Sequence, residues 1–193
     1  MTAPEHFRVR LLGTFGLEQD DRPIHHFNAN RPELLLMYMA IAPDMWHLRK
    51  SIAADIWPTT DVPTARKHLS YNLFLLKKLT ATYGLASPFE ENRHSLRLLP
   101  ALGLDTHEFL AELAAAGAAS EVEDRVRHLE SALELYGQGL LPSHRQPWLK
   151  GHQQRYEELA ASARQMMTAA LPAPMAAMAG HLHGIAGAWM PGG

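Results

Sequence analysis

The longest helical pattern in this chain covers residues 61–83 and reads DVPTARKHLSYNLFLLKKLTATY. Asp61 can accept hydrogen bonds from the free N–H groups of the first turn, and Pro63 needs no donor there. Small and apolar side chains recur at helical spacing and form one predicted core stripe: Ala65, Leu69, Leu73, Leu76 and Thr80. The opposite face carries polar, aromatic and basic side chains: Lys67, Ser70, Tyr71, Phe74, Lys77 and Lys78. The pattern therefore predicts a helix with one buried face, ending before Gly84.

The segments on either side of this helix complete a small α+β domain. Upstream, β-forming residues alternate around a bend at Gly13, and Pro43 and Pro58 end two further helical patterns. The predicted elements are strands at 7–15, 16–19 and 24–27, helices at 30–41, 48–57 and 61–83, and a hairpin of 89–91 and 95–98 around residues 92–94. Strand, three helices and hairpin is the element order of a winged helix.

The chain changes character after Pro100. Three amphipathic, Ala-rich helical patterns follow at 106–116, 121–136 and about 148–171. Successive helices joined by short turns predict an all-α array of helical hairpins. The sequence thus predicts a winged-helix domain over residues 1–100 and a helical domain over 103–193.

Five runs of sequence, in order, resemble the bacterial transcriptional activator family of the antibiotic-regulatory-protein type. They are VRLLGTF (9–15), IWPTTDVPTARKHL (56–69), LDTHEFLAEL (104–113), ALELYGQGLLP (132–142) and PWLKGHQQRYEELA (147–160). The resemblance implies an OmpR-like winged helix followed by a tetratricopeptide-like activator domain. It also implies a cytoplasmic transcription factor that binds direct repeats in promoter DNA, helps recruit RNA polymerase, and has neither catalytic activity nor a cofactor.

By motif position, the helix over 61–83 would be the recognition helix and residues 92–94 the tip of the wing. Family members usually end the recognition helix with a run like Ser-Arg-Leu-Arg-Arg. This chain has Phe74, Leu75, Leu76, Lys77 and Lys78 at the matching positions. Its activator domain is also shorter than in the family, where further helices follow.

The charge distribution favours DNA contact by one segment only. The chain has 18 Lys and Arg against 20 Asp and Glu, so its net charge is −2 and any anion-binding surface must be local. Residues 62–89 contain four basic and no acidic residues, whereas residues 101–193 have a net charge of −4 (6 basic, 10 acidic). The predicted DNA contacts are Arg66, Lys67, Lys77 and Lys78 with phosphates, Ser70 and Tyr71 with base edges, and Arg93 and His94 from the wing.

Phe74 and Leu75 leave a second function open. Two large apolar groups beside the basic residues could touch thymine methyl groups or another protein, and the pattern slightly favours a protein contact. The alternative is therefore a protein-interaction module whose winged helix no longer binds DNA. A homodimer is also expected, because an incomplete helical array exposes apolar ends that a second copy could cover.

Other classes of function find little support. The chain has no Cys, and neither His25–His26 nor His181 with His183 has the spacing of a metal-binding helix. No nucleophile-elbow or phosphate-loop pattern indicates an enzyme. The weakly polar run at 175–190 is too short to span a membrane. One remaining hypothesis is that the tail over 172–193 docks across the helical domain as an incomplete repeat.

Overall fold

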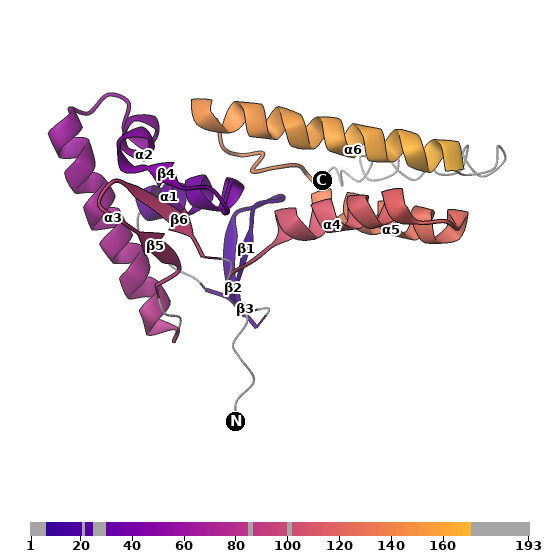
Figure 1. Ribbon diagram of the computed structural model, residues 1–193, viewed down its shortest axis with the longest axis horizontal. Coiled ribbons are helices and arrows are strands. Elements are labelled where there is room, and N and C mark those ends of the chain that lie inside the picture. The colour runs from indigo at the N-terminus through magenta and orange to yellow at the C-terminus, as the bar shows by residue number, and fades with distance from the viewer. Residues whose placement is uncertain (1–6, 21, 25–29, 85–86, 100–101, 171–193) are drawn as a thin grey trace, which may run out of the picture.

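The computed structural model describes residues 7–20, 22–24, 30–84, 87–99 and 102–170. They form two adjoining parts, one built from small sheets with three helices and the other from helices alone (Figure 1). Most of the strand predicted at 24–27, and the whole tail over 172–193, lie outside the described residues.

A four-stranded sheet lies where the two parts meet (Figure 1). In sheet order its strands are β3 (Arg22–Pro23), β2 (Gly16–Gln19), β1 (Phe7–Arg10) and β7 (Leu102–Leu104). β1 pairs antiparallel with β2 and parallel with β7. The strand predicted over 7–15 is interrupted after residue 10, and Gly13 in the connection has a φ of +81°, which favours glycine.

Three helices follow β3 in the predicted order and pack against one another. They are α1 (Asn30–Ile41), α2 (Arg49–Ile56) and α3 (Val62–Thr82), with the short strand β4 (His47–Leu48) before α2. The Asp61 side chain caps α3 by accepting a hydrogen bond from the Thr64 N–H at 3.0 Å, as predicted. The predicted core stripe of α3 is confirmed, because all five of its side chains are buried.

The predicted hairpin is confirmed as β5 (Phe89–Glu91) and β6 (Ser95–Leu98), which form a second sheet with β4 in the order β4-β6-β5. At its tip, the Asn92 side-chain oxygen accepts hydrogen bonds from the N–H groups of His94 and Ser95, each at 2.8 Å. This side chain closes the turn that joins the two strands.

The second part contains three long helices. They are α4 (Asp105–Ala118), α5 (Val122–Tyr136) and α6 (Lys150–Ala170), the last preceded by a 3₁₀ turn at Pro147–Leu149. α6 lies along α4 and α5 and reaches back over α1 (Figure 1), and Ala116, Leu129 and Ala163 join the three helices in one apolar cluster. The predicted helices are confirmed with shifts of one or two residues at most ends.

Hydrogen bonds from three of the quoted sequence runs meet at the junction between the two parts. Both carboxylate oxygens of Asp105 accept from the Leu11 N–H at 2.9 Å, and one also accepts from the Leu12 N–H at 2.8 Å. The Gly13 N–H donates to the Gly139 carbonyl at 2.7 Å. Because the apolar core also runs continuously from the sheet to α6, the two parts are held together by more than a linker.

A second contact joins the start of α6 to the first part. The Trp148 ring lies 5.0 Å from the Tyr38 ring, and the Tyr38 hydroxyl donates to Asp55 on α2 at 2.7 Å. Burial lowers the pKa of His144 and of His152, and the positive charge of Arg155 and the nearby His47 lower that of His152 further. Both imidazoles are therefore easier to protonate in the unfolded chain than in the folded one.

We expect the free energy of unfolding to fall as the pH is lowered from about 7 to about 5, because the unfolded chain then binds more protons at these two histidines. Urea unfolding at a series of pH values measures this slope. A His144→Gln/His152→Gln variant should show a flatter slope, whereas His107→Gln, an exposed change on α4, should not. An equal slope in the double variant would assign the pH dependence to other groups.

Candidate nucleic-acid interface

The start of α2, the first half of α3 and the tip of the hairpin enclose a groove of about 670 Å³. Its lining is Leu48, Arg49, Lys50, Arg66, Leu69, Ser70, Asn92, Arg93 and His94. The fold thus brings Arg66, Ser70, Arg93 and His94, which were predicted from sequence as DNA contacts, to one place. Arg49 and Lys50 join them, although no local pattern marked either residue.

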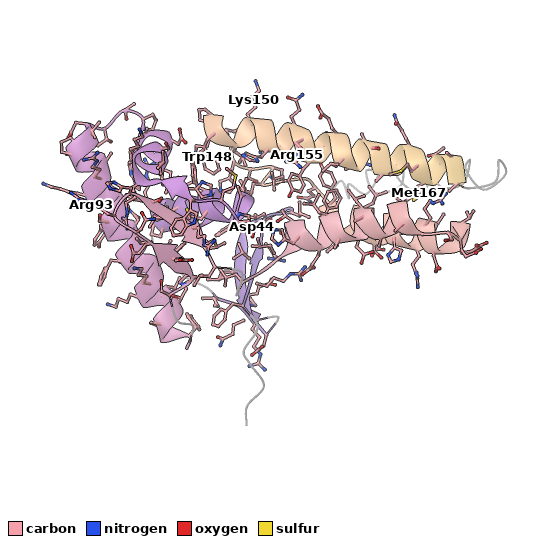
Figure 2. All side chains as sticks on the ribbon, in the orientation of Figure 1. Asp44, Arg93, Trp148, Lys150, Arg155 and Met167 are labelled. Atoms are coloured by element: carbon pink, nitrogen blue, oxygen red, sulfur yellow. The ribbon has the colours of Figure 1, made fainter. Side chains whose placement is uncertain are left out.

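Several exposed cations in this groove and along α3 form no ion pair among the described residues. Figure 2 shows Arg93 at the outer edge of the first part, far from α4, α5 and α6. Within the described ranges no carboxylate forms an ion pair with any of five exposed basic side chains: Lys50, Arg66, Lys67, Lys78 and Arg93. Their charge is therefore available to an anion from outside the chain.

Two other basic residues at this surface are held by Glu91 instead. The Arg49 guanidinium pairs with the Glu91 carboxylate at 2.6 Å, and the Lys77 ammonium pairs with its other oxygen. These cations, Lys77 first and then Arg49, lower the pKa of Glu91. Lys77 was predicted from sequence as a phosphate contact, but its charge is already paired with Glu91 of the same chain.

These ion pairs, together with hydrogen bonds of Arg49, fix the hairpin to the helices. The Arg49 backbone N–H donates to the His94 carbonyl at 2.9 Å, and its side chain also donates to the Asn92 carbonyl at 3.2 Å. Glu91 therefore ties α2, α3 and the hairpin into one unit, so that the groove keeps its shape. Arg97 lies further along the hairpin, where it pairs with Glu90 at 2.6 Å and covers the Trp46 ring.

The outer face of α3 differs from the prediction at one residue. Tyr71 and Phe74 are 61% and 58% exposed, and Lys67 and Lys78 are exposed on the same face. Leu75, which was predicted to share an exposed apolar patch with Phe74, is half-buried. The Ser70 hydroxyl donates to the Arg66 carbonyl at 3.1 Å but remains at the surface beside the groove.

Neither a metal centre nor a membrane-spanning segment is found in the described part of the chain. There, no three His, Asp or Glu side chains gather closely enough to hold an ion. Both His pairs considered from the sequence lie outside that part. Among the helices described, none combines the length and the hydrophobicity needed to cross a bilayer.

Comparison with known proteins adds a likeness of fold. No protein-family model and no curated protein matches the chain. Among solved structures, it is similar to Mycobacterium tuberculosis EmbR in complex with a low-affinity phosphopeptide, with 20% identity and a TM-score of 0.76. The match covers 86% of this chain, so it spans both parts, but only 45% of the EmbR chain. The whole arrangement, a small β region with helices followed by a helical part, is therefore one that a solved structure shares.

Proposed function

We propose that this chain is a bacterial transcription regulator of the antibiotic-regulatory-protein type, which binds duplex DNA through its winged helix. In this proposal α3 enters the major groove, where Ser70 and Tyr71 face base edges, while Arg93 and His94 on the wing approach the adjacent backbone. Helices α4, α5 and α6 form a tetratricopeptide-like domain, which serves dimerisation or recruits RNA polymerase. The division into domains 1–100 and 103–193 and a cytoplasmic location belong to the same proposal.

The observation that carries this proposal is the convergence of unpaired cations from three elements. Lys50 comes from α2, Arg66, Lys67 and Lys78 from α3, and Arg93 from the hairpin. Lys50, Arg66 and Arg93, which lie far apart in sequence, line one groove only because of the fold, and Glu91 beside it is already paired with Arg49 and Lys77. Regularly spaced phosphates on a duplex are an anionic partner that such a broad surface fits. The fold likeness to EmbR is consistent with this function.

Fluorescence anisotropy with random-sequence duplex DNA over a salt series tests the proposal. If all five cations contact phosphates, the log–log slope should approach roughly −4.5. The Arg66→Glu/Arg93→Glu variant should lose about 50-fold in affinity at roughly 0.1 M salt, since two contacts disappear. The matched control is Lys150→Glu/Arg155→Glu, the same charge change on α6, away from Arg93 (Figure 2), and it should bind as the wild type does.

Absence of binding by the wild type at low salt would contradict the proposal and favour a protein-interaction module. Equal losses in the two charge-reversed variants would contradict it as well, because the loss of affinity would then follow from the change in net charge and not from the position of the cations.

Lys77 and Lys78 provide a sharper comparison on one helix. Lys78→Ala should reduce the magnitude of the salt slope by about 0.9, because one phosphate contact is lost. Lys77→Ala should change the slope much less, because Glu91 already neutralises this side chain. The same anisotropy titration measures both. Equal slope changes would show that Lys77 leaves Glu91 when DNA binds.

A further inference from the structure

Two aromatic side chains lie on the exposed face of α3, where the described part of the chain leaves more than half of each side chain uncovered. Tyr71 and Phe74 are 61% and 58% exposed, and their spacing of three residues places them on one side of the helix. Leu75 turns partly into the protein. The exposed apolar surface is therefore a narrow pair of rings along the helix, rather than the wider Phe74–Leu75 patch that the sequence suggested.

A lysine lies on α3 on each side of this pair of rings. Lys67 lies one turn before Tyr71, Lys78 lies one turn after Phe74, and neither has an acidic partner among the described residues. Residues 62–89 contain no acid at all. An apolar strip with a free cation at each end is complementary to a partner that offers apolar groups between two rows of negative charge.

The major groove of duplex DNA is such a partner. It is about 12 Å wide and admits an α-helix between two phosphate backbones. Of the groups that base pairs present there, the C5-methyl of thymine is the apolar one, and Phe is among the side chains that contact it. A Phe ring has no hydrogen-bonding atom, so it gains nothing from the polar edge of a G·C pair.

We propose that Phe74, with Tyr71 beside it, is a specificity-determining residue that reads thymine C5-methyl groups in the major groove. This inference rests on the proposed DNA binding and adds to it a class of target, namely sites with thymine under the middle of α3. In this arrangement Lys67 and Lys78 lie over the two flanking DNA backbones. Arg66 and Arg93 contact DNA from the protein groove beside α3, which they both line.

The test uses the full chain and DNA that differs only in the methyl group. A duplex is first enriched by the wild type from a random pool, and its affinity is compared with that of the same duplex with deoxyuridine in place of thymine. We expect a loss of about fourfold for each methyl contact, the equivalent of ~0.8 kcal/mol for one buried methyl-sized group. Phe74→Ala should bind both duplexes alike, at about the affinity of the wild type for the deoxyuridine duplex.

The control variant is Met166→Ala, which removes an exposed apolar side chain from α6 and should leave the preference for thymine intact. Wild-type binding with the expected salt slope but no preference for thymine would overturn this inference alone. So would an unchanged preference in Phe74→Ala, and in either case a protein partner becomes the better occupant of this face. Failure of the wild type to bind any duplex at low salt would overturn the proposed function together with this inference.

Discussion

Phe109→Ala is expected to lower the free energy of unfolding by about 3–5 kcal/mol, the usual cost of removing a buried aromatic ring. Phe109 is completely buried on α4, and its ring lies 5.7 Å from both the Tyr136 ring on α5 and the Tyr156 ring on α6. The change would leave a cavity at the point where the three helices meet. Neighbouring aromatic rings are too rigid to fill it completely.

Urea unfolding followed by circular dichroism measures this loss. Phe109→Leu keeps most of the volume and should lose less than half as much, while Val122→Ala, an exposed change on α5, should lose little. If Phe109→Ala cost below about 1 kcal/mol, the helices would have to repack around the missing ring. That result would contradict the close contact of the Phe109, Tyr136 and Tyr156 rings.

Asp105→Ala is expected to destabilise the protein by about 3 kcal/mol, because two buried backbone N–H groups lose their acceptor. The donors are Leu11 and Leu12, which are buried directly after β1. Burial raises the pKa of Asp105, and the hydrogen bonds from these N–H groups act against that rise. The carboxylate is thus an internal acceptor that joins α4 to the sheet, not a surface charge.

Hydrogen exchange gives this variant a local readout. The amides of Leu11 and Leu12 should exchange faster in Asp105→Ala, by more than global destabilisation accounts for. Asp105→Asn keeps one side-chain oxygen and should fall between the variant and the wild type in stability. Unchanged protection of both amides in Asp105→Ala would contradict the assigned hydrogen bonds.

The junction around Asp105 also bears on the proposed function. It connects the strand next to β7 with the first residues of α4, and the Gly139 carbonyl holds the same connection from the loop after α5. These bonds fix α4 and the loop after α5 to the first part of the chain. If the proposed function holds, loosening them would change how the helical part is presented beside bound DNA, while the cations of α3 stay in place.

Much of the fold could be predicted because its signals are local. The cap of α3 needs only Asp61 and Thr64, three residues apart, and the hairpin turn needs only Asn92 and its next neighbours. The buried stripe of α3 follows from helical periodicity within one element. Pro43, Pro58, Gly84 and Gly137 follow the ends of α1, α2, α3 and α5 by one or two residues, as their backbone limits predict, whereas Gly117 lies inside α4.

The candidate interface was predictable only in part. The acid-free run of residues 62–89 located α3 as the basic element, and the hairpin located Arg93. Lys50 was missed because nothing near it in sequence indicates that α2 begins beside the wing. The assignment of individual DNA contacts stays a prediction until binding is measured.

Periodicity, caps and turn residues in the sequence are sufficient to place the elements of this protein, because each acts over a few residues. The partners of its charged groups can be identified only in the folded structure. Glu91 meets Lys77 across 14 residues and Arg49 across 42, and Asp105 meets Leu11 across 94. Such pairings depend on which segments the core brings together, and they separate the cations that stabilise the fold from those left free to bind a ligand.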